Sequence, residues 1–243
     1  NSPADGRTIL IGNVSTYAIA PATMKNPGYD PVKSFAPIVQ TSDICSVMVT
    51  GTSFPANTVQ EFVTYARANP GKISYGSAGI GNSAHLLGEL LQSKAQLNMV
   101  HVPYRSGAEM SMAVLSGQVQ FAMTDLSASI AQIREGKLKA LAVTGITRAL
   151  DLPNVPTFIE VGYPDIVLRN WTGAAVPAGT PPAMVKRLES AFNEILKMPE
   201  YVSAMRKMGG DAKPNSSEEF GQMIAADFKK WNEVSKAAGI SID

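Results

Sequence analysis

Short apolar runs alternate with helical patterns through the middle of the chain. The apolar runs predict strands at residues 72–75, 99–102, 121–123 and 138–143. Helical patterns follow the first three runs: one with an apolar face of Leu86, Leu87, Leu90 and Leu91, then 107–116 and 127–135. Strands separated by helices of about ten residues predict βαβ units and a mainly parallel sheet.

Several helices carry start signals. Capping boxes at 58–61 and 216–219 each place Thr or Ser three residues ahead of Glu, before an apolar periodic run. Thr180-Pro181 predicts an N-cap followed by proline in the first turn. The chain is therefore expected to end in two amphipathic helices separated by Gly209-Gly210.

Two apolar runs are interpreted as crossovers between lobes. They cover residues 44–50 and 171–176, and the compact strand–helix series lies between them. This pattern predicts a discontinuous lobe 1 (1–46 plus 171–243) and a lobe 2 (47–170). Ligands of such α/β proteins sit at the carboxyl ends of strands, in the crevice between lobes.

Composition narrows the classes of function. The 243 residues carry 21 Lys and Arg against 20 Asp and Glu, a net charge of +1 without a basic stripe, so nucleic-acid binding is not expected. Cys45 is expected to be a small buried hydrophobe, and one cysteine with two histidines excludes a disulfide framework and an ordinary structural zinc site. No apolar run approaches the roughly 18 residues of a membrane span. The start at Asn1, without a signal peptide, indicates a processed or truncated product.

The segment between residues 75 and 85 carries the most informative chemistry. Its glycines let the backbone approach a ligand closely, and the following helix offers unpaired N–H groups and the positive end of its dipole. Asn82 and Ser83 add side-chain donors, so the segment is interpreted as an anion site. The alternative is a tight turn with an N-cap. A dinucleotide fingerprint and a P-loop are not favoured, because the third glycine and a Gly-Lys-Ser/Thr sequence are missing.

Nucleophilic catalysis is not favoured by the residues of this segment. Ser83 and His85 lie two positions apart on a helix and do not face each other, which argues against a serine hydrolase. His85 is expected to hydrogen-bond locally or line the pocket. His101, between two valines on a strand, is interpreted as a structural histidine.

Other polar residues follow strand ends. Asp125 either caps the next helix or faces the crevice, where it accepts a hydrogen bond from a ligand ammonium, hydroxyl or water. Asn13 begins a polar loop at another strand end. Tyr104 and Ser106 follow the strand at 99–102 and are candidates for lining the opening of the same ligand crevice. Arg169 is expected to be solvated rather than paired with a ligand carboxylate.

A series of short motifs carries a family resemblance along nearly the whole chain. In order, these are Asp-Gly-Arg-Thr-Ile-Leu (5–10), Tyr-Asp-Pro-Val-Lys-Ser-Phe-Ala-Pro-Ile (29–38), Ala-Asn-Pro-Gly-Lys (68–72), Ser-Ala-Gly-Ile-Gly-Asn-Ser-Ala-His-Leu (77–86), Val-His-Val-Pro-Tyr (100–104), Ala-Leu-Ala-Val-Thr (140–144), Leu-Pro-Asn-Val-Pro-Thr (152–157) and Pro-Ala-Gly-Thr-Pro (177–181). With this order and spacing, the chain resembles the Bug/TctC family, the periplasmic solute-binding receptors of tripartite tricarboxylate transporters.

The resemblance implies an α/β, two-lobed periplasmic-binding-protein fold of type II, the Venus-flytrap architecture. It implies a receptor without catalysis, cofactor or metal that binds a small carboxylate, such as a dicarboxylate, an amino acid or an aromatic acid. It also implies a periplasmic location and a membrane permease as the partner.

The resemblance also implies which residues bind the ligand. The family's carboxylate loop corresponds here to Ser77, Gly79, Gly81, Asn82, Ser83 and His85. Asp125 corresponds to the family's acidic residue at the end of the strand of residues 120–125. Asn13 corresponds to a residue of the loop that closes over the ligand from the other lobe.

One departure from the family concerns the start of the chain. Family members begin with two further strand–helix units before the Asp-Gly motif, whereas this chain starts just ahead of Asp5. We therefore expect either an internal fragment or a lobe 1 that lacks its first strand–helix units. A monomer is expected, with association as the alternative in the second case, since an incomplete sheet exposes its edge and faces.

The sequence thus predicts an extracytoplasmic receptor that captures a small carboxylate between two lobes and delivers it to a membrane permease. The alternatives are a ligand-sensing module for a membrane signalling partner and, less favoured, an enzyme on the same scaffold.

Overall fold

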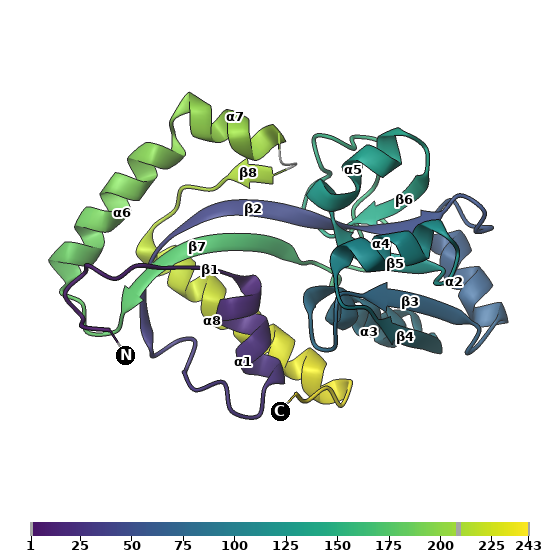
Figure 1. The fold of residues 1–243 in the computed structure, drawn as a ribbon, viewed down its shortest axis with the longest axis horizontal. Helices are drawn as coiled ribbons and strands as arrows, with labels where there is room; N and C mark the ends of the chain where they lie inside the picture. Colours follow the sequence, from purple (N-terminus) through teal and green to yellow (C-terminus); the bar gives the residue numbers. More distant parts are fainter. Residues whose placement is uncertain (1, 208–209, 243) are drawn as a thin grey trace. The chain divides into compact units, whose positions relative to one another are not determined.

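The computed structural model describes residues 2–207 and 210–242, and the chain divides into two compact units. Unit 1 combines residues 1–43 with 170–243, and unit 2 comprises residues 44–169. Strand β2 (Phe35–Gly51) passes from unit 1 into unit 2, and β7 (Arg169–Pro177) begins at the return boundary (Figure 1). The predicted crossovers at 44–50 and 171–176 lie inside these two strands.

Unit 2 is a strand–helix series that follows the predicted order. After α2 (Val59–Ala68), the series contains β3 (Ile73–Ser77), α3 (Ser83–Ala95), β4 (Met99–Pro103), α4 (Gly107–Leu115), β5 (Phe121–Asp125), α5 (Leu126–Arg134) and β6 (Leu138–Val143). Every strand and helix expected between residues 72 and 143 is present, with ends shifted by at most a few residues. The capping box predicted at 58–61 is only half formed: the Thr58 side chain accepts a hydrogen bond from the Glu61 N–H, whereas the Glu61 carboxylate accepts from the Asn57 N–H instead of that of Thr58.

The expectation of a mainly parallel sheet is only partly correct. Strand β3 pairs in parallel with β4 and β5, whereas β2 pairs antiparallel with both β5 and β6. The strands joined by crossover helices share one direction, as the βαβ rule requires. Strand β2 is an exception because it arrives from unit 1 and inserts between β5 and β6 with the opposite direction.

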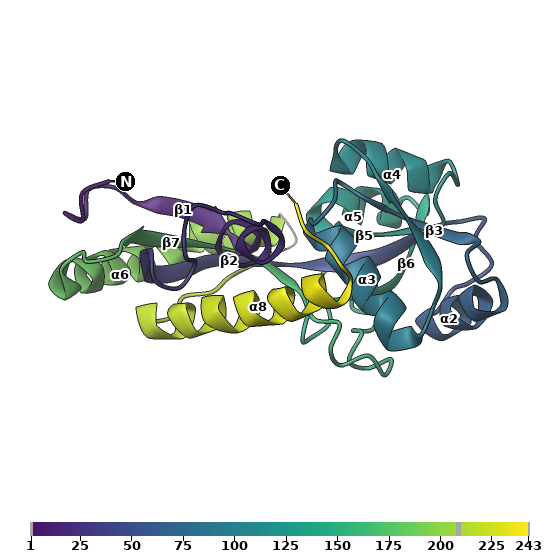
Figure 2. The same cartoon turned by 90° about the horizontal axis from the view of Figure 1, so that it is seen from below.

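The two faces of β3 pack against different helices. A side chain at Gly88 of α3 would collide with the ring of Tyr75, whereas one at Gly76 would collide with Met110 of α4. Since neighbouring residues of a strand point to opposite faces, α3 and α4 lie on opposite sides of β3 (Figure 2). Tyr75 and Ser77 therefore both face α3.

Unit 1 is built on the antiparallel pair β1 (Leu10–Asn13) and β7, with β2 beside β7. A π-helical turn η1 (Ser15–Ile19) and the short α1 (Ala20–Thr23) follow β1, and both contact α8 (Ser217–Ala237). Helices α6 (Pro182–Leu196) and α7 (Pro199–Lys207) pack on a buried cluster that includes Ile38, Val39, Ala174 and Val176. Figure 1 shows these helices in green.

The carboxyl-terminal region differs from the expectation in two respects. It contains three helices and the short strand β8 (Gly210–Ala212), not two helices; Gly209 of the predicted separator lies outside the described residues. Thr180 does not cap α6, because its hydroxyl donates to the Pro177 carbonyl and Pro181 occupies the N-cap position. The capping box at residues 216–219 is confirmed in full.

Within the described ranges, none of the helices combines the length and apolar character needed to cross a bilayer. The same residues contain no cluster of three or more His, Cys, Asp or Glu side chains suited to a metal ion. Cys45 is half-buried, which corrects the expectation of a buried hydrophobe.

Candidate functional site

The turn between β3 and α3 is shaped by two glycines. Gly79 has φ +123° and Gly81 has φ +74°, backbone conformations that residues with a Cβ rarely adopt. The turn links Ser77, the last residue of β3, to Asn82, the N-cap of α3. The segment from residue 75 to residue 85 contains no Lys, Arg, Asp or Glu. Any anion held here would therefore be bound by backbone and uncharged polar groups.

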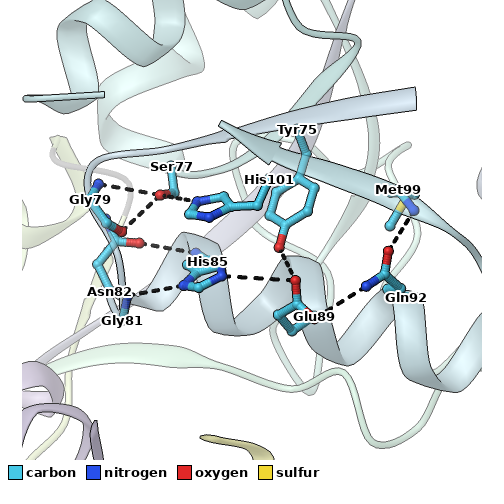
Figure 3. Close-up of polar contacts among 10 residues, drawn as sticks. All are labelled: Tyr75, Ser77, Gly79, Gly81, Asn82, His85, Glu89, Gln92, Met99 and His101. Atoms are coloured by element: carbon cyan, nitrogen blue, oxygen red, sulfur yellow. Dashed lines mark hydrogen bonds and ion pairs between the residues drawn. The ribbon is translucent and has the colours of Figure 1, made fainter. Parts of the chain in front are cut away.

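Ser77 anchors the start of the turn and is fully buried. Its hydroxyl donates to the Gly79 carbonyl at 2.8 Å, accepts from the Gly79 N–H at 3.3 Å and lies 2.7 Å from His101 Nε2 (Figure 3). These three bonds are compatible when His101 carries a proton on Nε2. The hydroxyl then uses its one donor and both acceptor positions, so a ligand could bond to Ser77 only by replacing one of them.

Asn82 and His85 fix the end of the turn. The Asn82 side-chain oxygen accepts from the His85 N–H at 3.0 Å and caps α3. The Gly81 N–H donates to His85 Nδ1 at 3.0 Å. The His85 side chain is buried, and its Nε2 lies 3.8 Å from Glu89 Oε1. His85 thus makes the local hydrogen bond expected from the sequence and lies within the interior of unit 2.

The ring of His101 stacks on that of His85, with centroids 3.7 Å apart and an interplanar angle of 10°. Tyr75 flanks both rings, and its hydroxyl donates to Glu89 at 2.5 Å. Burial lowers the pKa of His85, opposed by the Glu89 carboxylate. Burial and the neighbouring His85 lower the pKa of His101 to about 4. Both rings are therefore uncharged near neutral pH.

Sequence reasoning missed the bond between Ser77 and His101. The two residues are 24 positions apart, but the parallel register pairs Tyr75 with His101, and Ser77 follows on the same face of β3. A serine beside a histidine is also an arrangement used in nucleophilic catalysis. Here the hydroxyl is fully buried and bonded to the turn, so the pair has the geometry of a structural support.

The first turn of α3 retains unused donors. The backbone N–H groups of Ser83 and Ala84 have no hydrogen-bond partner among the residues that the structure describes. Both belong to the first helical turn, where the helix dipole favours negative charge. The Ser83 side chain is half-buried beside them. The turn can therefore accept a small anion at this helix end.

Asp125 ends β5, the strand that pairs with β3 in parallel. Ser77 and Asp125 therefore lie at the same end of the sheet. The Asp125 side chain occupies the N-cap position of α5 but makes no capping hydrogen bond, which excludes the capping interpretation. The side chain is exposed, yet surrounding protein atoms raise the pKa of its carboxyl, opposed by a hydrogen bond with Ser46.

The remaining candidates are Asn13, Ser106 and Tyr104. Asn13 belongs to unit 1, where its side-chain oxygen accepts hydrogen bonds from the Thr16 N–H and hydroxyl. Ser106, a candidate for the mouth of the site, caps α4 by accepting from the Glu109 N–H. Tyr104 follows β4 and donates its N–H to the Ser77 carbonyl, which ties β4 to the start of the turn.

Comparison with known families decides what kind of protein carries this turn. The sequence matches the family described as "Tripartite tricarboxylate transporter family receptor" over residues 1–240. The chain belongs to this TctC family. Its members are receptors of transporters, with a periplasmic solute-binding fold, and the fold expected from the resemblance is confirmed.

Relatives of this TctC receptor extend the likeness to structure. A UPF0065 protein in the gbd 5' region of Cupriavidus necator is 32% identical over 98% of this chain and 71% of the relative. The structure of periplasmic binding protein BugD is 32% identical, with a TM-score of 0.82 over 99% of this chain and 81% of that chain. R. palustris Rpa4515 with adipate is 28% identical, with a TM-score of 0.85 over the same shares of the two chains.

Proposed function

We propose that this TctC receptor binds a small organic carboxylate at the β3–α3 turn and delivers it to the permease of a tripartite transporter. The observation that carries the proposal is the pair of unpartnered N–H groups at Ser83 and Ala84, which begin a capped helix behind a glycine turn without charged side chains. A carboxylate oxygen can accept hydrogen bonds from these N–H groups, and the helix dipole favours its negative charge at this end. The adipate complex of Rpa4515, a dicarboxylate bound by a relative, supports the same ligand class.

The site residues have four different roles under this proposal. Gly79, Gly81 and Ser77 shape the turn, whereas Asn82 and Ser83 offer donors to the carboxylate. Asp125, at the end of the neighbouring strand, accepts from a hydroxyl, ammonium or water on the far side of the ligand. Asn13 closes over the ligand from the other lobe. Closure that depends on the ligand then marks the loaded receptor for the permease in the periplasm.

A thermal-shift screen of the purified chain tests the ligand class. The panel contains adipate, shorter dicarboxylates, amino acids and aromatic acids. A ligand that binds only the native state stabilises it by about 2.7 kcal/mol at a hundredfold excess over Kd. A midpoint shift with carboxylates, and none with the matching amides, is expected. A cooperative transition that no acid shifts would contradict the proposal.

Two matched N-caps test the position of the site. Asn82→Ala and Thr58→Ala each remove the side-chain cap of one helix in unit 2, α3 or α2. Each change is expected to cost stability by about 1 kcal/mol. Only Asn82→Ala is expected to weaken binding of the acid found in the screen, by about tenfold, equivalent to about 1.4 kcal/mol. Equal binding losses in both variants would place the site elsewhere.

A further inference from the structure

Two imidazole rings hold the two ends of the β3–α3 turn. His101 Nε2 contacts the Ser77 hydroxyl at 2.7 Å, where the turn begins, and His85 Nδ1 accepts from the Gly81 N–H at 3.0 Å, where it ends (Figure 3). The rings come from different elements, β4 and α3, and stack face to face at 3.7 Å. The turn is thus fastened at both ends to one stacked unit, the histidine pair.

The hydrogen bonds fix where the protons of the pair lie. Because His85 Nδ1 accepts from a backbone N–H, it carries no proton, and the single ring proton sits on Nε2, which faces Glu89. Because the Ser77 hydroxyl donates to the Gly79 carbonyl, His101 donates from Nε2. In this arrangement each imidazole is neutral and holds a defined tautomer.

We propose that His85 and His101 are positioning residues of the ligand site: as an uncharged pair they hold the 77–82 turn in the shape that presents the Ser83 and Ala84 N–H groups, and proton uptake by the pair releases the ligand. The inference rests on the proposed function, because it concerns the same site. Neither histidine needs to touch the ligand.

A proton on the pair would break this arrangement. A second ring proton on His85 must go to Nδ1, which then meets the Gly81 N–H as a donor facing a donor. A charge on both rings would place like charges face to face at 3.7 Å. Ligand binding is therefore expected to weaken at low pH, because a proton on the pair breaks the Gly81–His85 bond or sets two charged rings against each other.

Among the residues that the structure describes, the titratable side chains found against the pair are those of Glu89 and Tyr75. Glu89 of α3 lies 3.8 Å from His85 Nε2 and favours its charged form, and Tyr75 of β3 donates its hydroxyl to Glu89. Phe121 of β5 stacks on Tyr75 and is uncharged. Burial outweighs the carboxylate and lowers the pKa of His85, while burial and His85 lower that of His101. The pair is therefore expected to take up protons only below the ordinary histidine pKa of 6.5.

Conservative and apolar variants separate positioning from packing. In His85→Asn, the amide oxygen can replace Nδ1 as the acceptor for Gly81; in His101→Gln, the amide nitrogen can replace Nε2 as the donor to Ser77. Neither amide titrates in this range. His85→Leu and His101→Leu remove the polar contacts. Circular dichroism and a thermal transition establish that each variant is folded.

The first measurement uses the ligand-free protein and amide hydrogen exchange by NMR. The Gly81 amide is expected to be protected in the wild type and in His85→Asn, and to exchange about tenfold faster or more in His85→Leu. The ¹⁵N shifts of His85 should report an unprotonated Nδ1 at pH 7. Unchanged Gly81 exchange in folded His85→Leu would overturn the proposal, whether or not a ligand is known.

The second measurement is calorimetric titration with adipate between pH 7.5 and pH 4.5. The leucine variants are expected to bind about tenfold more weakly at pH 7.5, and the Asn/Gln double variant within about threefold of the wild type. Protonation of adipate itself weakens binding equally in all variants. If adipate affinity falls more steeply with decreasing pH in the wild type than in the double variant, the difference is due to protonation of the histidine pair. Identical pH profiles would overturn the proposal. If the wild type binds neither adipate nor any other acid, the proposed function fails, and the exchange measurement alone decides the positioning role.

Discussion

The indole N–H of Trp171 donates to a carboxylate oxygen of Asp227 at 2.6 Å. Trp171 lies in β7 and is almost fully buried, where it stacks on Tyr17 and meets the edge of Phe220. Asp227 lies on α8. This hydrogen bond, set in an aromatic cluster, joins α8 to β7, the strand with which the chain returns to unit 1.

Removing the carboxylate is expected to destabilise unit 1. Asp227→Leu leaves the buried Trp171 N–H without its acceptor, a loss of about 1–3 kcal/mol in the free energy of unfolding. Asp227→Asn keeps an acceptor oxygen and is expected to lose less. Urea unfolding followed by tryptophan fluorescence measures both. Equal stability of Asp227→Leu and the wild type would show that the bond contributes nothing net.

The same carboxyl predicts a pH dependence of stability. Burial raises the pKa of Asp227 and the nearby Asp43 adds to this, while the Trp171 bond and Lys230 oppose it. A carboxyl with a raised folded-state pKa binds its proton more tightly in the native state than in the unfolded state. Its contribution is therefore most favourable below the unfolded value of 3.8 and is lost as pH rises through the folded pKa.

Comparison with Asp227→Asn isolates this contribution. As pH rises from below 4 to neutrality, the wild type is expected to lose stability relative to Asp227→Asn, which cannot ionise at this position. Urea midpoints at a series of pH values measure the difference. A constant difference across the series would mean that the carboxyl titrates normally in the folded chain.

Gly88 in the middle of α3 is held to glycine by packing. A Cβ placed there would collide with Tyr75 Cε2, and Tyr75 is fully buried with its hydroxyl bonded to Glu89. Gly88→Ala is expected to destabilise the chain by about 1–3 kcal/mol through overpacking, although alanine in an open helix would gain about 0.5–1 kcal/mol. Thermal or urea unfolding measures the change.

Gly107→Ala is the matched control for this prediction. Gly107 begins α4, and a Cβ there meets nothing within 4 Å. This variant is expected to be as stable as the wild type or slightly more so. If both alanine variants behave alike, the crowding at Tyr75 is relieved by movement of the ring, and the packing argument is wrong.

Local patterns predicted much of this molecule. The glycine turn between residues 75 and 85 and the capping box at 216–219 each depend on a few neighbouring residues, and the structure has both. The alternative of a tight turn with an N-cap did not assign the cap to a residue, and the structure assigns it to Asn82. The prediction for Thr180 was wrong because its hydroxyl found a competing local acceptor, the Pro177 carbonyl. The sequence pattern alone does not decide whether the Thr180 hydroxyl bonds to a backbone N–H of the following helix or to the preceding Pro177 carbonyl.

What the sequence did not predict depends on pairing between distant segments. The contact of Ser77 with His101 requires the register of β3 against β4, and the stacking of His85 on His101 requires α3 to cover that face. The reversed direction of β2 also has no local signal, because its apolar run reads the same either way. Strand order and register arise from tertiary packing, which periodicity does not encode.

Glu160 is expected to titrate with a pKa of about 2, well below its ordinary value of 4.5. Arg148 holds this carboxylate through Nε at 3.0 Å and Nη2 at 2.9 Å, and the Thr157 N–H donates to it at 2.7 Å. All three favour the charged form. Because the folded pKa is depressed, the stabilisation is present above pH 4.5 and is lost as pH falls toward 2.

Arg148→Gln is expected to raise the pKa of Glu160 toward 4.5, though not fully, since the Thr157 bond remains. Carboxyl ¹³C shifts followed by NMR measure this, with Lys137→Gln as a control that removes a positive charge from the same unit without touching Glu160. A Glu160 pKa that stays near 2 in Arg148→Gln would assign the depression to the backbone bond instead of to the arginine.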